Sequence, residues 1–270
     1  MRVIGVGDNV VDDYRHARTL YPGGNALNFA VFARMLDSDS AYLGLFGSDA
    51  AAEHLQDTLD VLGIDRSRCR TADGPSGRAT WDLEDGQRIF VESNGGGVSR
   101  SFAMDFVLDD PEYLQSFSIL HTSTYSHLDQ CLARFQSLGL PVSYDFSDDF
   151  DQEYALSICR YLDFGFFSCA GWPVGSVREL LQGARNQGCG MSVATRGPED
   201  VLLFDGEAWF EQPAGQAKPR DTLGAGDAFI TAFLVSCASG IQIPVALERG
   251  AAFAAEVCQL PGAFGHGQRY

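Results

Sequence analysis

Apolar and polar residues follow two different spacings along most of the chain. Short apolar runs predict strands, and the intervening segments, with apolar residues every three or four positions, predict helices. Strands are expected at residues 3–7, 41–46, 118–121, 141–146, 164–168 and 191–195. Helices are expected at residues 24–36, 50–62, 128–138, 152–162, 174–185, 225–239 and 245–258. Alternation of buried strands with helices is typical of a mainly parallel sheet covered by helices, and therefore of an α/β protein.

The pattern changes at residues 77–97. Two β-rich runs, 79–83 and 88–91, flank an Asp85-Gly86 turn, and Asn94-Gly95-Gly96-Gly97 follows as a joint. This is a hairpin signature. A second hairpin is expected around Asp205-Gly206. We therefore expect one α/β domain over residues 1–270 with a small β lid formed mainly by 77–97. An apolar outer face on the lid strands would allow a homodimer to form through the lid.

Composition narrows the class of partner. Hydrophobic residues make up 45% of the chain, which is enough for a sizeable core, and the net charge is −17. So negative a chain is not expected to bind nucleic acid or an anionic membrane, although backbone amides can still hold a phosphate locally. No apolar run reaches the roughly 18 residues that a membrane span needs. The seven cysteines form no C-x-x-C pair, which favours reduced thiols and a cytoplasmic protein.

The most informative stretch is Asp221-Thr222-Leu223-Gly224-Ala225-Gly226-Asp227. A glycine-rich turn here enters an apolar helix, and the free amides at a helix N-terminus form an anion site. Asp227 falls in the first turn, where it could accept a proton from an attacking hydroxyl group beside a transferring phosphoryl group. The alternative is that the glycines only shape a loop and that Asp227 only caps the helix.

This stretch resembles the C-terminal signature of the ribokinase-like (PfkB) carbohydrate kinases, and Pro22-Gly23-Gly24-Asn25-Ala26-Leu27-Asn28 resembles their N-terminal signature. The resemblance implies a ribokinase-like three-layer sandwich and the ATP-dependent phosphorylation of a sugar hydroxyl with Mg²⁺. It also implies that Asp227 is the catalytic base. The anion hole would be formed by Gly224, Ala225 and Gly226, and the nucleotide would be bound near Thr195, Gly197, Thr222, Gly224 and Gly226.

Features of the first 150 residues narrow the expected substrate. Gly7-Asp8-Asn9-Val10-Val11-Asp12 and Tyr144-Asp145-Phe146-Ser147-Asp148 resemble the fructoselysine 6-kinases within that family. The expected substrate is therefore a fructosamine, that is, a small sugar amine. By the family resemblance Asp12, Gly24 and Asn28 bind the sugar. Arg88 on the lid is expected to reach a hydroxyl or phosphate group, and His121 to line the pocket.

Two departures from the family pattern leave alternatives open, one at residues 168–171 and one at Asp200, which stands where the family often has the last glycine of Thr-x-Gly-x-x-Gly. Ser168-Cys169-Ala170-Gly171 stands where many members have Asn-x-x-Glu near the magnesium–phosphate site. Asp145 or Asp148 would then face either the magnesium–phosphate region or a substrate ammonium, and Arg196 would add charge near the nucleotide phosphates. The remaining alternatives are a kinase for another ketose or a nucleoside, and a non-catalytic protein that binds a sugar or nucleotide. A dinucleotide-dependent dehydrogenase is disfavoured, because Gly5-Val6-Gly7 lacks the third glycine of that fingerprint.

Overall fold

The large sheet carries the predicted strands. The computed structural model describes residues 1–84, 87–215 and 219–270, with the backbone alone at positions 83, 84, 87 and 88. Within these residues, nine strands form this sheet: β1 (Arg2–Gly7), β4 (Asp39–Phe46), β5 (Arg70–Thr71), β8 (Ile119–Ser123), β9 (Val142–Asp145), β10 (Phe164–Ser168), β11 (Met191–Thr195), β12 (Val201–Phe204) and β13 (Trp209–Gln212). Their order is β13-β12-β11-β10-β9-β8-β1-β4-β5. Only the pairings of β11 with β12 and of β12 with β13 are antiparallel, so the predicted mainly parallel sheet is confirmed.

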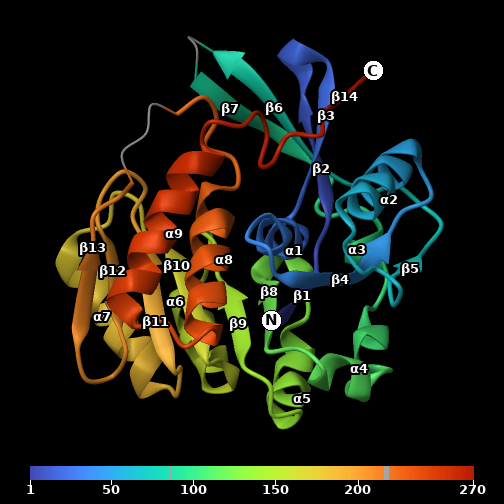
Figure 1. Cartoon of the computed structure of the whole chain (residues 1–270). Helices are drawn as coiled ribbons and strands as arrows, with labels where there is room; N and C mark the ends of the chain where they lie inside the picture. The colour runs from blue at the N-terminus through green and yellow to red at the C-terminus, as the bar shows by residue number, and fades with distance from the viewer. Residues whose placement is uncertain (85–86, 216–218) are drawn as a thin grey trace.

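Helices cover both faces of this sheet (Figure 1). One face carries α1 (Asn25–Met35), α2 (Ala50–Leu62), α8 (Ala225–Ala238) and α9 (Ile243–Val257). The opposite face carries α5 (Leu132–Ser137), α6 (Gln152–Ile158) and α7 (Val174–Asn186). The short helices α3 (Val98–Ser101) and α4 (Pro111–Gln115) link β7 (Gln87–Ser93) to β8.

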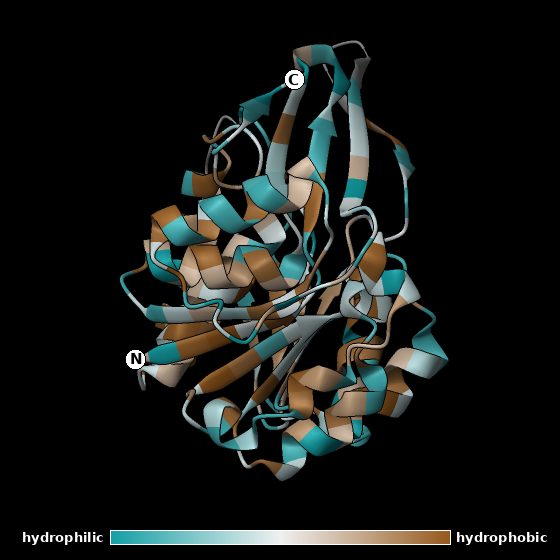
Figure 2. Ribbon diagram, turned by 90° about the vertical axis from the view of Figure 1, so that its right-hand side faces the viewer, coloured by the Kyte–Doolittle hydropathy of each residue, from teal (hydrophilic) through white to brown (hydrophobic). Residues whose placement is uncertain are grey.

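Successive residues of each strand point to opposite layers, which fills both cores from one sequence. In β10, Phe166 packs in the core that contains Phe233 of α8, whereas Phe167 stacks on Phe146 in the core under α5, α6 and α7. Figure 2 shows hydrophobic colour concentrated on the central strands and on the helices beside them. The three-layer α/β sandwich expected from the sequence is therefore confirmed.

The second sheet is larger than the sequence predicted. It joins β7 to β2 (Val10–Tyr14), β3 (Thr19–Gly23), β6 (Gly77–Glu84) and β14 (Gln268–Arg269), in the order β14-β3-β2-β6-β7. The hairpin expected within 77–97 is present as β6 and β7, and its turn at Asp85-Gly86 lies outside the described residues. The other three strands come from segments without a strand pattern, so the lid extends beyond the predicted segment 77–97. Asp12 accordingly lies inside β2 and not in a loop after β1.

Helix ends follow local chemistry. Asp49 precedes α2 and its side chain accepts a hydrogen bond from the backbone nitrogen of Ala52 at 3.0 Å, while Gly63 with φ of 68° ends the helix as predicted. Among the described helices none is both long enough and apolar enough to cross a membrane.

Candidate active site

The glycine corner, defined here as residues 221–227, begins α8 with a left-handed residue. Gly224 is the N-cap with φ of 75°, and a Cβ atom added there would lie 2.7 Å from Cβ of Ala263. Both facts require glycine. In the described part of the chain, the backbone nitrogens of Gly226 and Asp227 have no hydrogen-bond acceptor. The corner therefore presents free amides and the positive end of the α8 dipole, as an anion site requires.

Asp227 lies at this corner with its carboxylate fixed by a residue from the other sequence motif. Its Oδ2 accepts a hydrogen bond of 2.7 Å from Nδ2 of Asn28 on α1. Asp227 is partly exposed, whereas Asn28 is only 4% exposed. Burial of the carboxylate raises the pKa of Asp227 well above its usual value, and the negative charge of Asp145 raises it further. A raised pKa makes this carboxylate a stronger base when it is ionised.

Asn28 also presents an unused acceptor. Its Oδ1 atom is buried and has no partner among the described residues. A buried carbonyl oxygen without a partner is costly, so a donor from a bound ligand would relieve that cost.

The first turn of α1 is held by acids from neighbouring strand ends. Asp8, which follows β1, accepts hydrogen bonds from the backbone nitrogen of Asn25 at 2.6 Å and from the hydroxyls of Ser123 and Ser126 at 2.9 and 2.8 Å. Gly24 precedes the helix with φ of 108°, and a Cβ atom there would lie 2.8 Å from Cα of Asn9. The predicted Gly24 position is therefore one where only glycine lets the chain pass so close to β1.

Asp145, at the end of β9, is the third carboxylate of this region. Its Oδ2 accepts a hydrogen bond of 2.8 Å from Nδ2 of Asn25, and its Oδ1 accepts one of 2.9 Å from the backbone nitrogen of Ser147. Asp145 is 6% exposed, and burial raises its pKa to about 6. Asn25 and Asn28 thus connect α1 to Asp145 and Asp227 respectively.

The lid supplies Asp12. Its side chain is buried, and its Oδ1 accepts a hydrogen bond of 2.8 Å from Nε1 of Trp81 on β6. A Cβ atom added at Gly23 would lie 2.3 Å from Oδ2 of Asp12. The carboxylate therefore lies against Gly23, the residue that precedes the predicted Gly24.

The predicted nucleotide residues follow β11 and precede α8. Oγ1 of Thr195 lies 3.5 Å from Oγ of Ser168, and Gly197 has φ of 65°. Thr222 is exposed, and its carbonyl oxygen accepts a hydrogen bond from the backbone nitrogen of Ala225 at 3.3 Å. Arg196 is 9% exposed and forms an ion pair with Glu199, and its buried Nε has no partner among the described residues.

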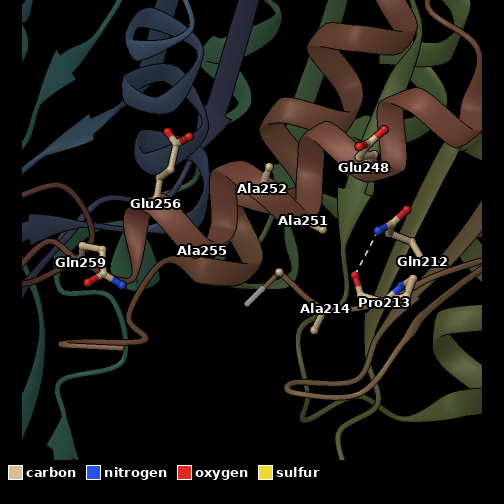
Figure 3. A pocket seen from close by; sticks show the side chains of 10 residues that line it. Gln212, Pro213, Ala214, Glu248, Ala251, Ala252, Ala255, Glu256 and Gln259 are labelled. Carbon is tan, nitrogen blue, oxygen red and sulfur yellow. Dashed lines mark hydrogen bonds between the residues drawn. The ribbon is translucent and has the colours of Figure 1, made fainter. Parts of the chain in front are cut away.

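An open pocket of about 680 Å³ lies between α9 and the segment that leads from β13 towards the glycine corner (Figure 3). The lining residues on one side are Gln212, Pro213, Ala214 and Gly215, and on the other Ala251, Ala252, Ala255 and residues of the same helix. Small side chains leave the space open and make its walls largely apolar. None of the residues predicted from the sequence to form the site lines this pocket. An alanine-rich helix face carries no sequence pattern that indicates a binding pocket.

One predicted substrate contact, that of His121, is contradicted by the geometry. His121 is fully buried in β8, packs on Phe29 with 4.8 Å between ring centres, and has Nδ1 3.0 Å from Oγ of Ser143. Burial lowers its pKa to about 3, so it is a neutral core residue that a sugar cannot reach in this structure. The expectation that His121 lines the pocket is corrected on this ground. The side chain of Arg88 lies outside the described residues.

Sequence reasoning also missed contacts that the fold creates. Trp81 was seen only as part of a hairpin, and its indole nitrogen is the partner of Asp12. Strand alternation could have placed Trp81 on one face of the lid, but the register against β2 was needed to identify its partner.

The glycine corner, its fixed carboxylate and the three-layer fold define a carbohydrate kinase. The pfkB family carbohydrate kinase model matches residues 1–137 and 166–265, and the chain belongs to that family, as the two motifs predicted. The chain is 40% identical over 271 residues to "Fructosamine kinase FrlD" of Bacillus subtilis, covering 100% of this chain and 95% of that protein. It is 29% identical over 261 residues to "Fructoselysine 6-kinase" of Escherichia coli, covering 96% and 98%.

Solved structures agree with this fold. The structure of Arabidopsis thaliana ribokinase complexed with ribose and ATP gives a TM-score of 0.83 at 21% identity, covering 99% of this chain and 95% of that one. Ribokinase from Thermotoga maritima gives 0.79 at 21% identity, with coverage of 99% and 95%. The ribokinase-like fold is confirmed.

Proposed function

We propose that this carbohydrate kinase transfers the γ-phosphoryl group of ATP to a hydroxyl group of a fructosamine such as fructoselysine. The observation that carries the proposal is the Asn28–Asp227 hydrogen bond, which holds a base at the free amides of α8. The substrate class is supported by 40% identity over the whole chain to a protein named for fructosamine.

The proposed reaction uses these groups in one step. Asp227 accepts the proton of the sugar hydroxyl as its oxygen forms a bond to the γ-phosphorus, while the bond from that phosphorus to the bridging oxygen of ADP breaks. Of the corner amides predicted to form the anion hole, at Gly224, Ala225 and Gly226, that of Ala225 donates to the carbonyl oxygen of Thr222 in this structure. Those of Gly224 and Gly226 would stabilise negative charge on the phosphoryl oxygens. Asn28 keeps the carboxylate oriented, and its free Oδ1 would accept a hydrogen bond from a sugar hydroxyl.

The sugar would lie between the lid and the first turn of α1. Asp12 and the Gly24 region would contact its hydroxyl groups, since a carboxylate can accept from two adjacent hydroxyls. The substrate amine would be protonated near neutral pH. Asp12 and Asp145 are among the charges that act on Asp227, and a site edged by these three carboxylates would suit a cationic substrate better than an anionic one.

The nucleotide would run along the carboxyl ends of the parallel strands, where ligands of open α/β sheets bind. Its phosphates would lie near Thr195, Gly197 and the corner, with Thr222 beside them. The alanine-lined pocket between α9 and residues 212–215 has mainly apolar walls, with Glu248 and Glu256 also in the lining, and the volume for a purine base.

Mg²⁺ is expected to arrive with the nucleotide. In the described residues no group of three or more His, Cys, Asp or Glu side chains is placed to hold a metal ion. This fits Mg²⁺, which keeps several water ligands and binds phosphates readily. The ion would neutralise charge on the phosphates, and Asp145 is a candidate carboxylate for a contact through water.

A homodimer through the lid is the proposed assembly. β7 is an edge strand of the lid, and Ile89, Phe90 and Val91 on it are 38%, 57% and 39% exposed. An edge strand with exposed apolar side chains favours pairing with a second copy of the same chain.

A substrate panel tests the proposed function. Purified protein with Mg-ATP is assayed for ADP release with fructoselysine, fructose, ribose and a nucleoside in parallel. We expect the highest kcat/KM with fructoselysine. A higher value with another sugar would overturn the substrate class, and binding without turnover on every member of the panel would overturn catalysis.

A further inference from the structure

We propose that Tyr14 is a positioning residue that couples the sugar-binding lid to the glycine corner, an inference that rests on the proposed kinase function. Tyr14 lies on β2 in the lid, and its hydroxyl donates a hydrogen bond of 2.7 Å to Oδ2 of Asp221. The two residues are 207 positions apart in sequence. The bond therefore links two parts of the site that the chain does not connect locally.

The tyrosine is held firmly at the lid end of this link. Its side chain is 7% exposed, and its ring makes an edge contact with Tyr21 of β3 at 5.1 Å between ring centres. A rigid, buried ring restricts the position of its hydroxyl, so displacement of β2 would be passed on to Asp221.

Asp221 also accepts hydrogen bonds from two backbone nitrogens at or beside the glycine corner. Its Oδ1 accepts a hydrogen bond from the backbone nitrogen of Leu223 at 3.0 Å, and its Oδ2 also accepts one from the backbone nitrogen of Gly262 at 2.9 Å. The next residue, Ala263, lies against Gly224, because a Cβ atom at Gly224 would come within 2.7 Å of it. One carboxylate thus positions both the corner and the segment that packs under it.

The sugar side of the link is two residues away on the same strand. Side chains alternate along a strand, so Asp12 and Tyr14 lie on one face of β2 and Asp13 on the other. The contacts agree: Asp13 pairs with Tyr270 and Arg78, whereas Asp12 contacts Trp81 and Tyr14 contacts Asp221. A sugar held by Asp12 would stabilise the position of β2 in which Tyr14 meets Asp221.

The expected consequence is synergy between the two substrates. A ligand that favours one arrangement of a shared element raises the affinity of a second ligand that favours the same arrangement, and the effect is reciprocal. Bound sugar would therefore tighten nucleotide binding at the corner through Tyr14, and bound nucleotide would tighten sugar binding by the same factor.

The test removes only the hydroxyl group. Tyr14→Phe keeps the ring, and Tyr21→Phe is the matched control, because the Tyr21 hydroxyl has no hydrogen bond among the described contacts. Calorimetry measures the Kd of a non-hydrolysable ATP analogue with Mg²⁺, in the absence and presence of saturating fructoselysine. We expect the sugar to lower this Kd in the wild type and in Tyr21→Phe. In Tyr14→Phe the ratio of the Kd without sugar to the Kd with sugar should fall about five- to tenfold, at the lower end of typical coupling between two sites.

A second measurement separates coupling from simple loss of stability. Hydrogen exchange at the backbone of residues 221–227 should be faster in Tyr14→Phe, while exchange in α2 stays as in the wild type. An unchanged Kd ratio in Tyr14→Phe, or equal acceleration of exchange throughout the protein, would overturn the inference alone if the wild type still phosphorylates the sugar. A wild type that binds no sugar or transfers no phosphate would overturn the proposed function as well.

Discussion

Nδ2 of Asn28 donates a hydrogen bond of 2.7 Å to Oδ2 of Asp227 across 199 positions of sequence. This contact joins the two motifs that identify the family: one begins α1, the other begins α8, and the two helices pack side by side (Figure 1). The sugar side and the phosphoryl side of the proposed site are therefore fixed to each other by one amide group.

Removing the charge of Asp227 should abolish catalysis while sparing nucleotide binding. We expect Asp227→Asn to lower kcat about 10²- to 10⁴-fold, the usual contribution of a general base. ADP release and binding of an ATP analogue would be measured side by side. Asp57→Asn, an exposed acid on α2, is the control. Turnover within a few-fold of the wild type would exclude Asp227 as the base.

The acidic limb of the pH profile should depend on Asp145. The pKa of Asp227 is raised by burial and then by the negative charge of Asp145, so Asp227 gains a proton, and loses its function as a base, as pH falls through that raised value. Asp145→Asn removes the neighbouring charge and lowers the pKa of Asp227. We expect the acidic limb of kcat to move to lower pH by up to about one unit.

The matched variant for this experiment is Asp148→Asn, which changes an exposed acid three residues further along the same turn. Asp148→Asn should shift the acidic limb less than Asp145→Asn does, because Asp148 is not among the main charges that act on Asp227. Profiles of kcat from pH 5 to pH 9 are compared. Equal shifts in the two variants would mean that general surface charge, and not Asp145, sets the limb.

Filling the pocket between α9 and residues 212–215 should weaken nucleotide binding selectively. Ala252 is exposed on the pocket wall, so Ala252→Leu occupies space without disturbing the core. We expect KM for ATP to rise about tenfold, with KM for the sugar unchanged. Ala238→Leu, at the C-terminal end of α8 and far from the glycine corner, is the control for an added apolar side chain on a helix surface. An unchanged KM for ATP in Ala252→Leu would show that the purine base of the nucleotide binds outside this pocket.

Charge on the lid edge should prevent dimerisation. Phe90 is the most exposed of the three apolar residues on β7, and an isologous interface would place the same surface patch of both copies face to face. We expect Phe90→Glu to convert a dimer into a monomer in light scattering coupled to size-exclusion chromatography. Val61→Glu on α2, where Val61 is 78% exposed, tests the same substitution away from the lid. A wild-type protein that is monomeric throughout would contradict the assembly.

The sequence predicted the body of the molecule well because its strands are apolar runs and its helices have regular apolar spacing. α1 and α8 differ from the predicted 24–36 and 225–239 by one residue at their ends. β2 and β3 were missed because Asp12, Asp13 and Pro22 are typical of loops, and their strand conformation depends on pairing with β6 and with each other.

The site was predicted correctly where a motif fixes the backbone conformation. It was predicted wrongly where burial decides whether a side chain can reach a ligand. The positive φ values of Gly24 and Gly224 follow from the motifs themselves. Whether a histidine at a strand end faces a cleft or the core depends on the helix above it, and Phe29 of α1 covers His121. The sequence did not indicate a role for Tyr14, because its partner Asp221 lies in the segment before α8 and only the folded lid brings the two residues together.

The four hydrogen bonds that Asp8 accepts, from two backbone nitrogens of α1 and two serine hydroxyls, have a practical consequence for mutational surveys. Replacing Asp8 removes the cap of the helix that carries Asn25 and Asn28, so the loss of activity would reflect a displaced scaffold. In a saturation screen scored only by growth, Asp8 and Asp227 would be equally intolerant. Only protein abundance, measured beside growth, would separate the residue that builds the cleft from the residue that moves the proton.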